Sequence, residues 1–149
     1  MKIFLAIVVV CAVILIGTFV VLKGKEWPSA PVPVPVKPLE TENVKVFEPL
    51  PGAKIKSPLV VRGEARGTWY FEASFPVRLK DAGGREIAVM PAQANGEWMT
   101  TDFVPFEVVL NFEMLEAAAG TVGTLILEKD NPSGLPEHND SVSMSVVFE

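Results

Sequence analysis

Residues 59–66 read LVVRGEAR, a stretch in which apolar or small residues alternate with mostly charged ones. Successive side chains of a β-strand point to opposite faces of a sheet, so a period of two predicts a strand with one buried face. The segments 75–80 (FPVRLK), 104–111 (VPFEVVLN) and 142–149 (VSMSVVFE) repeat this pattern. We therefore expect the C-terminal part of the chain to be an all-β domain.

Turn signals separate the expected strands. Residues 87–92 (IAVMPA) are apolar on both faces, which is typical of a central strand. Residues 112–119 form the one stretch that looks helical, for a turn or two. About seven short strands in about 100 residues predict an antiparallel β-sandwich of the immunoglobulin type. The expected turns are PG at 51–52, DAGG at 81–84, NG at 95–96 and NPSG at 131–134.

The N-terminal segment predicts a membrane anchor. Ile3 to Leu22 contains no charged residue, and a helix of that length is about 30 Å long, the thickness of the hydrocarbon core of a bilayer. The stretch is longer than the apolar part of a secretory signal peptide and is followed by Lys23-Gly24-Lys25, so we expect an uncleaved signal anchor over residues 1–25. The folded segment that follows favours a single-pass topology with the C-terminal domain outside the cytoplasmic membrane.

Residues 26–43 predict a linker between the anchor and the domain. Pro28 to Pro38 reads PSAPVPVPVKP, and its prolines remove backbone donors and fix φ, which favours polyproline II. Such a segment would hold the next domain up to roughly 30 Å from the membrane. A proline-rich ligand for an SH3-like groove is the alternative interpretation. The domain itself is expected over residues 44–149.

The composition argues against several classes of function. The chain has 13 Lys and Arg against 18 Asp and Glu, a net charge of −5, whereas nucleic-acid binding calls for a basic surface. Residues 44–149 contain nine basic and fifteen acidic residues, a net charge of 9 − 15 = −6, and should avoid anionic lipid surfaces. One Cys and one His supply neither an intramolecular disulfide nor the paired imidazoles of most zinc sites. We expect no metal and no cofactor.

Four blocks of residues carry a family resemblance. They are SPLVVRGEARGTW at 57–69, FEASFPV at 71–77, GEWM at 96–99, and NPSG at 131–134 followed by Pro136-Glu137 and Asp140. In this order they resemble the immunoglobulin-like domain of bacterial spore germination proteins, over nearly all of Val44 to Glu149. The resemblance implies a bacterial, extracytoplasmic, non-catalytic β-sandwich of a kind that is often tethered to a membrane.

Two aromatic residues are candidates for a glycan-binding platform. Tyr70 follows Trp69 and precedes Phe71, and Trp98 lies beside the turn at 95–96. Strand alternation would place Trp69 and Phe71 on one face, with Trp69 filling the core, and Tyr70 on the other face. An exposed Tyr70 beside an exposed Trp98 would offer a flat surface to a sugar ring. The alternative for both Trp residues is packing in the core.

The segment from Asp130 to Asp140 (DNPSGLPEHND) is the second candidate site. Long loops on a rigid sandwich often carry recognition, so we list it as a partner-binding loop. Its oxygen ligands also suit calcium, although the spacing of an EF-hand is missing, and the same residue types build tight turns. The candidate residues for binding a partner are Asp130, Asn131, Ser133, Glu137, His138 and Asp140.

Catalysis has little support in the sequence. Ser133, His138 and Asp140 include the residue types of a hydrolase triad, but they lie within one short loop, where alignment with an oxyanion hole is difficult. Glu107 and Glu113 could form a pair of carboxylates, yet nothing indicates a cleft that would raise the pKa of one of them. We therefore expect no catalytic residues.

These observations together predict a membrane-anchored, non-catalytic binding or assembly module of the bacterial cell envelope. Its expected contacts are the cytoplasmic membrane, through Ile3 to Leu22, and another envelope protein. A cell-wall carbohydrate is the alternative partner, bound by Tyr70 and Trp98, and a hydrolase is a remote alternative.

Overall fold

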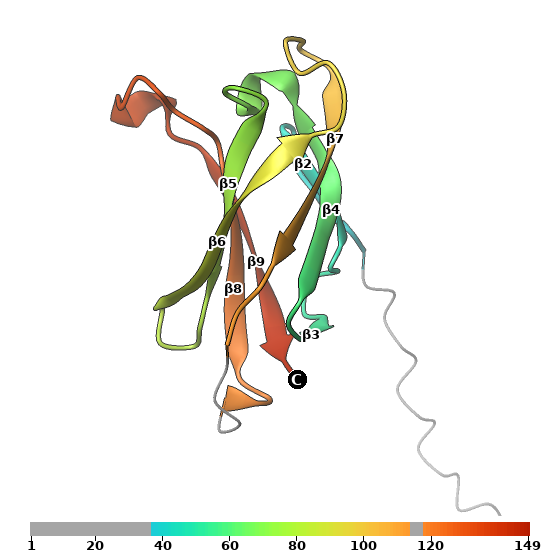
Figure 1. Cartoon of the computed structure of the whole chain (residues 1–149), viewed down its shortest axis with the longest axis vertical. Helices are drawn as coiled ribbons and strands as arrows, with labels where there is room; N and C mark the ends of the chain where they lie inside the picture. The colour runs from blue at the N-terminus through green and yellow to red at the C-terminus, as the bar shows by residue number, and fades with distance from the viewer. Residues whose placement is uncertain (1–36, 114–117) are drawn as a thin grey trace, which may run out of the picture. The chain divides into compact units, whose positions relative to one another are not determined.

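The computed structural model describes residues 37–113 and 118–149, and these residues form a single curled sheet of nine strands (Figure 1). The expected all-β class is confirmed: the described ranges contain no α-helix and no helix long and apolar enough to cross a membrane. The predicted anchor over Ile3 to Leu22 lies outside the described residues, as does most of the predicted stalk. The elements are β1 (Leu39–Glu40), β2 (Val44–Glu48), β3 (Lys54–Ile55), β4 (Leu59–Arg66), η1 (Gly67–Trp69), β5 (Ser74–Lys80), β6 (Glu86–Ala94), β7 (Phe103–Leu110), β8 (Val122–Glu128), η3 (Pro136–His138) and β9 (Ser141–Phe148).

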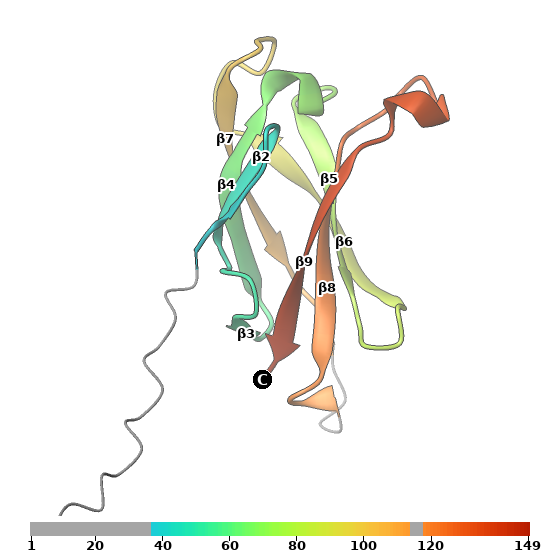
Figure 2. The ribbon, with the colours of Figure 1, turned by 180° about the vertical axis from the view of Figure 1, so that it is seen from behind.

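The strand order of the sheet is β1-β2-β4-β7-β6-β5-β8-β9-β3. Neighbouring strands are antiparallel except β3 and β9, which pair in parallel. The sheet curls so that β2, β4 and β7 face β5, β8 and β9 across the core (Figures 1 and 2). The two layers are joined through β6 and β7, whose register contains only the pairs Gln93 with Glu107 and Ala94 with Phe106.

The predicted alternation of buried and exposed residues is confirmed in the main strands. In β4 every second residue from Leu59 to Ala65 is buried, and β7 and β8 alternate in the same way. The core also contains a chain of edge-to-face aromatic contacts, in which Phe75 lies 5.1 Å from Tyr70 and 5.0 Å from Phe106 between ring centroids. Such contacts add to the stabilisation that comes from removing apolar surface from water.

The structure differs from the expected strand pattern at two places. Nine strands are present rather than about seven, because Leu39–Glu40 and Lys54–Ile55 add short strands at the two ends of the sheet. Leu39 and Glu40, expected in the linker, pair with Val46 and Lys45. Of the segment expected to be helical, Phe112 and Glu113 have no regular structure, Ala118 has 3-10 conformation and Ala119 lies in a turn, and residues 114–117 lie outside the described ranges.

The prediction of a buried central strand over residues 87–92 was wrong in its burial. The strand has neighbours on both sides in the sheet order, but Val89 is 43% exposed and Met90 is 45% exposed. Val89 lies opposite Arg78 on the outer face of the sheet, whereas Met90 lies opposite the buried Val77 on the inner face. The inner face is incompletely covered at Met90 because β7 pairs with β6 only at Gln93 and Ala94.

The predicted alternation of the aromatic run was also wrong. Trp69 and Tyr70 are both buried, whereas Phe71 is exposed. The reason is that Gly67–Trp69 forms a 3-10 turn, which rotates successive side chains by much less than a strand does. Tyr70 therefore enters the core, where its hydroxyl donates a hydrogen bond of 2.8 Å to the carbonyl of Val104.

We predict that the stability of the domain falls at high pH because of Tyr70. Burial raises the pKa of the Tyr70 phenol above its usual value near 10. Because the pKa is higher in the folded than in the unfolded state, stability is complete below pH 10 and falls as the pH rises above it. Phenolate absorbance of this sole tyrosine should appear together with unfolding. Tyr70→Phe should lose stability at neutral pH but show a weaker decline above pH 10; an equally steep decline would contradict the assignment.

We predict that Gly63→Ala destabilises the domain by about 2 kcal/mol, within the range for overpacked cores. A Cβ at position 63 would lie 2.7 Å from the Phe106 ring and would collide with the carbonyl of Lys45 across the β2–β4 ladder. Gly83→Ala is the matched control, since its Cβ would meet only the Asp81 side chain at 3.3 Å. Urea denaturation of both variants should show a large loss for the first and a small one for the second; equal midpoints would contradict the packing argument.

Candidate docking surfaces

The loop between β8 and β9 is tied to the sandwich at its base. The Lys129 N–H donates to the Asp140 carbonyl at 2.9 Å, and the Asp130 N–H donates to the Trp69 carbonyl at 3.1 Å. The Asn43 side-chain amide donates to a carboxylate oxygen of Asp140 at 3.3 Å. Figure 1 shows the loop projecting away from the strands beyond this base. Asp130 and Asp140 therefore belong to the attachment of the loop rather than to its tip.

The tip of the loop is organised by its own side chains. The Asn131 amide donates to the carbonyl of Leu135 and to the Asn139 side-chain oxygen, both at 2.8 Å. The Ser133 hydroxyl donates to the Asn131 side-chain oxygen and lies 3.0 Å from Nδ1 of His138. These hydrogen bonds are made within the loop and hold its turn together. The Leu135 side chain is 48% exposed. The loop thus presents an apolar side chain on a fixed backbone.

The structure brings Ser133 and His138 together but not the third member of a triad. Asp140 accepts its side-chain hydrogen bond from Asn43, and the Ser133 hydroxyl is oriented toward Asn131. Glu137 and His138 lie in the short 3-10 turn η3 and are exposed. Within residues 37–113 and 118–149, no group of three or more His, Cys, Asp or Glu residues is placed to hold a metal ion.

The two candidate platform aromatics do not form a joint exposed face. Tyr70 is only 4% exposed, and its ring packs on Phe75 in the core. Trp98 is half-buried and packs against the core cluster from the hairpin between β6 and β7. The expectation that Tyr70 is exposed was wrong, because its side chain enters the core after the 3-10 turn. Its ring offers no face on which a sugar could stack.

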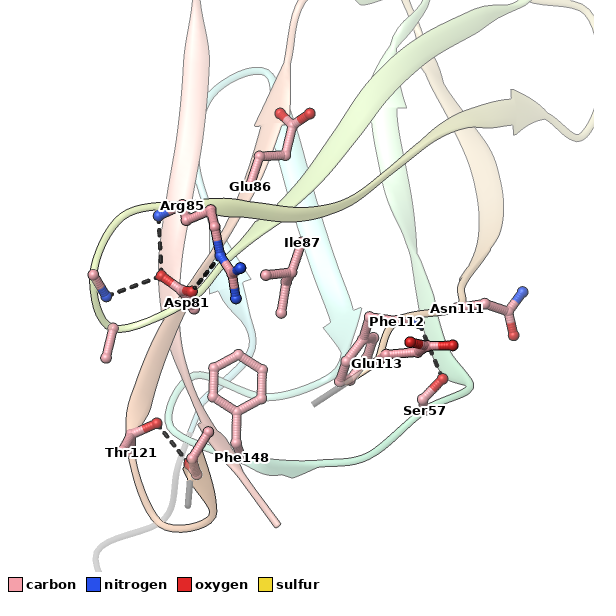
Figure 3. Close-up of a pocket in the computed structure, with 13 residues that line it drawn as sticks. Ser57, Asp81, Arg85, Glu86, Ile87, Asn111, Phe112, Glu113, Thr121 and Phe148 are labelled. Carbon is pink, nitrogen blue, oxygen red and sulfur yellow. Dashed lines mark hydrogen bonds and ion pairs between the residues drawn. The ribbon is translucent and has the colours of Figure 1, made fainter. Parts of the chain in front are cut away.

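A third surface, not anticipated from the sequence, is an opening at the opposite end of the domain from the β8–β9 loop. It lies between the start of β6 and the chain after β7, and Figure 3 shows Ile87, Phe112 and Phe148 turned toward it. The sequence contained one signal for the incomplete pairing of β6 beside it. Pro91 lies inside the run 87–92, and a proline within a strand indicates an edge rather than a fully paired central strand.

Charged groups line the rim of this opening. Asp81, Glu86 and Glu113 line it together with a single basic residue, Arg85. Asp81 accepts hydrogen bonds from the N–H groups of Arg85 and Gly83, both at 3.0 Å, and pairs with the Arg85 side chain at 3.1 Å. These contacts, the backbone bond from Arg85 first, hold the pKa of Asp81 below its usual range, so its carboxylate stays ionised at neutral pH. Glu86 contacts the Arg78 guanidinium at 2.7 Å, so two of the three carboxylates at the rim are paired with an arginine.

Ion pairs on the outside of the strands fix the positions of two neighbouring carboxylates. The Arg78 guanidinium contacts Glu86 and Glu128, each at 2.7 Å, which raises the pKa of Arg78. On the other layer, Arg62 contacts Glu107 at 2.7 Å and Glu48 at 2.9 Å. Exposed pairs of this kind add little stability, but each one connects adjacent strands.

Comparison with known proteins identifies the family of the domain. Residues 43–132 match the model of a family, Gmad2, described as the immunoglobulin-like domain of bacterial spore germination. No match was found among curated proteins or among solved structures. The matched region is more than half of the chain and runs from the residue before β2 past the end of β8. The resemblance seen in the sequence is thereby confirmed, and the chain belongs to the family of immunoglobulin-like domains of bacterial spore germination.

Proposed function

We propose that this protein is a non-catalytic docking module of the bacterial cell envelope, which is held at the cytoplasmic membrane by Ile3 to Leu22 and binds another envelope protein through its β8–β9 loop. The observation that carries the proposal is the exposed Leu135 on a loop whose backbone is fixed by two side chains: the Asn131 amide donates to the Leu135 carbonyl, and the Ser133 hydroxyl accepts from the Leu135 N–H. A recognition loop that is ordered before binding loses little conformational entropy when the partner docks.

The chemistry of the loop favours a protein partner. Leu135 supplies an apolar contact, while Glu137 and His138 beside it supply polar groups, and this combination is typical of small protein interfaces. The Ser133 hydroxyl and the Asn131 amide are engaged within the loop and therefore serve its shape. A partner would then contact the outward-facing side chains of Leu135, Glu137 and His138.

The proposed location is tested by protease accessibility. With an epitope after Glu149, the domain should be digested in intact cells from which the wall has been removed. A marker protein of the cytoplasm should stay intact in the same sample. Protection of the epitope until the cells are lysed would instead place the domain in the cytoplasm and would overturn the proposed location.

The proposed surface is tested by Leu135→Asp in the full chain. Burial of a leucine contributes about 1.5 to 3 kcal/mol, so the variant should recover at least about tenfold less of the partner after crosslinking in membranes. Val122→Asp is the matched control, because Val122 is 55% exposed at the other end of the domain. Thermal denaturation should show that both variants fold. Equal recovery by the two variants would contradict a role of the loop.

A further inference from the structure

We propose that two copies of this chain pair through the free edge of β9, so that the sheet of one copy continues into the sheet of the other. This edge begins beyond the tip of the β8–β9 loop, so the inference holds or fails independently of the proposed function. Three observations carry it: backbone groups of β9 that no described residue pairs, an edge without charged side chains, and a set of donors and acceptors that complements itself.

The hydrogen bonds at the two ends of β9 show which of its residues face away from β8. At one end the Lys129 N–H donates to the Asp140 carbonyl at 2.9 Å. At the other end the Phe148 N–H donates to the Thr121 carbonyl at 3.0 Å. The β8–β9 register has no shift, and the backbone groups of a strand alternate between its two sides. Even-numbered residues of β9 therefore bond to β8, and odd-numbered residues direct their N–H and C=O groups to the other side.

On this other side, a neighbouring strand covers only the C-terminal end of β9. The parallel strand β3 pairs with Val147 and Phe148, and Figure 2 shows it beside the lower end of β9. The Ser145 carbonyl accepts a bond of 2.7 Å from the Gly52 N–H that precedes β3. Beside the rest of the strand, the sheet order contains no further neighbour. Within residues 37–113 and 118–149, the backbone groups of Ser141 and Ser143 therefore have no hydrogen-bond partner.

The edge lacks the side chains that usually keep strand edges apart. Natural proteins protect exposed edges with charged residues, prolines or bulges. Here the exposed outer-face residues are Ser141, Ser143 and Ser145, which are small and neutral, whereas the outer faces of other strands carry charged residues such as Arg62 and Glu107. Like-charged surfaces repel, and residues 44–149 have a net charge of −6. At this edge two copies can meet without placing like charges opposite each other.

One antiparallel register uses all of the free groups. If Ser141 lies opposite Ser143 of the second copy, the two residues exchange two bonds, and the two-fold axis repeats them, which gives four bonds. The two neighbouring registers are less complete. One of them requires the Ser145 carbonyl, which already accepts a bond, and the other places Ser143 opposite Asn139, whose N–H is already bonded within the loop. The free donors and acceptors of the edge are thus self-complementary.

The side chains also match in this register. Val142 would lie opposite Val142 of the second copy in a non-hydrogen-bonded pair, where facing side chains are closest. Val142 is half-buried against the core in the single chain, so the pair would cover its remaining apolar surface. On the outer face, the hydroxyls of Ser141 and Ser143 could bond to each other. Asp140 would lie opposite Met144 rather than opposite another carboxylate.

Disulfide capture tests the pairing in the full chain. Cys11→Ala removes the single natural cysteine, and Val142→Cys is introduced in this background. Facing residues of a non-hydrogen-bonded pair have Cα atoms about 4.5 Å apart, within the range of disulfides, so mild oxidation in detergent micelles should give a covalent dimer. Val122→Cys is the matched control, because Val122 is 55% exposed at the other end of the β8–β9 ladder. It should give at least about tenfold less dimer. Equal yields, or no dimer from Val142→Cys, would overturn the inference.

Variants at position 143, made together with Val142→Cys, separate strand pairing from contacts elsewhere in the chain. Ser143→Pro removes two of the four bonds while leaving the bonds to β8 intact, so the dimer yield should fall at least about tenfold. Ser143→Ala keeps the donor and should give nearly the full yield. Thermal denaturation should show that both variants are folded. If the proline variant does not fold, Ser143→Glu replaces it, because two carboxylates beside the two-fold axis should lower the yield in the same way. A yield that the proline or glutamate variant leaves unchanged would show that the copies meet through another surface.

Discussion

The pairing of β4 with β7 is the interaction on which the rest of the domain depends. Their register runs without a shift from Leu59 opposite Leu110 to Arg66 opposite Phe103. This ladder aligns the buried residues of both strands on one face, and it places Phe106 against Gly63, where no larger residue fits. β7 also pairs with β6, the strand that connects to the second layer. The position of β7 on β4 therefore determines where the two layers are joined.

The incomplete pairing between β6 and β7 has a cause in the backbone chemistry of the chain. Pro91 leaves β6 without a donor at one position of its outer edge, so continuous pairing with β7 along this edge would lose a bond there. The strand instead stays paired to β5 and diverges from β7 below Gln93. Ala88 and Ala92, which are small, share the inner face with Met90, so little side-chain volume fills the space beside them. The two-layer arrangement is thus compatible with a local interruption of pairing between β6 and β7.

The sequence predicted the fold class because period-two burial is a local property. The inner faces of β4, β5 and β7 and the turns at Asp81 and Asn95 follow from residue type and spacing alone. It did not predict the burial of Tyr70, because a 3-10 turn after Arg66 changed the rotation between neighbouring side chains. The exposure of Met90 was missed for a different reason, since it depends on where β7, far along the chain, stops pairing with β6.

The opening and the β8–β9 loop lie in different parts of the chain relative to the family match. Both strands that border the opening, β6 and β7, lie within the matched residues 43–132, so the opening rests on the part of the chain that defines the domain. The loop residues from Ser133 to Asp140 follow the last matched residue, Pro132, but the contacts that shape their tip are made largely by Asn131, which lies within the match. A docking role of the loop would therefore depend on residues on both sides of the end of the match, because Asn131 fixes the backbone that carries Leu135.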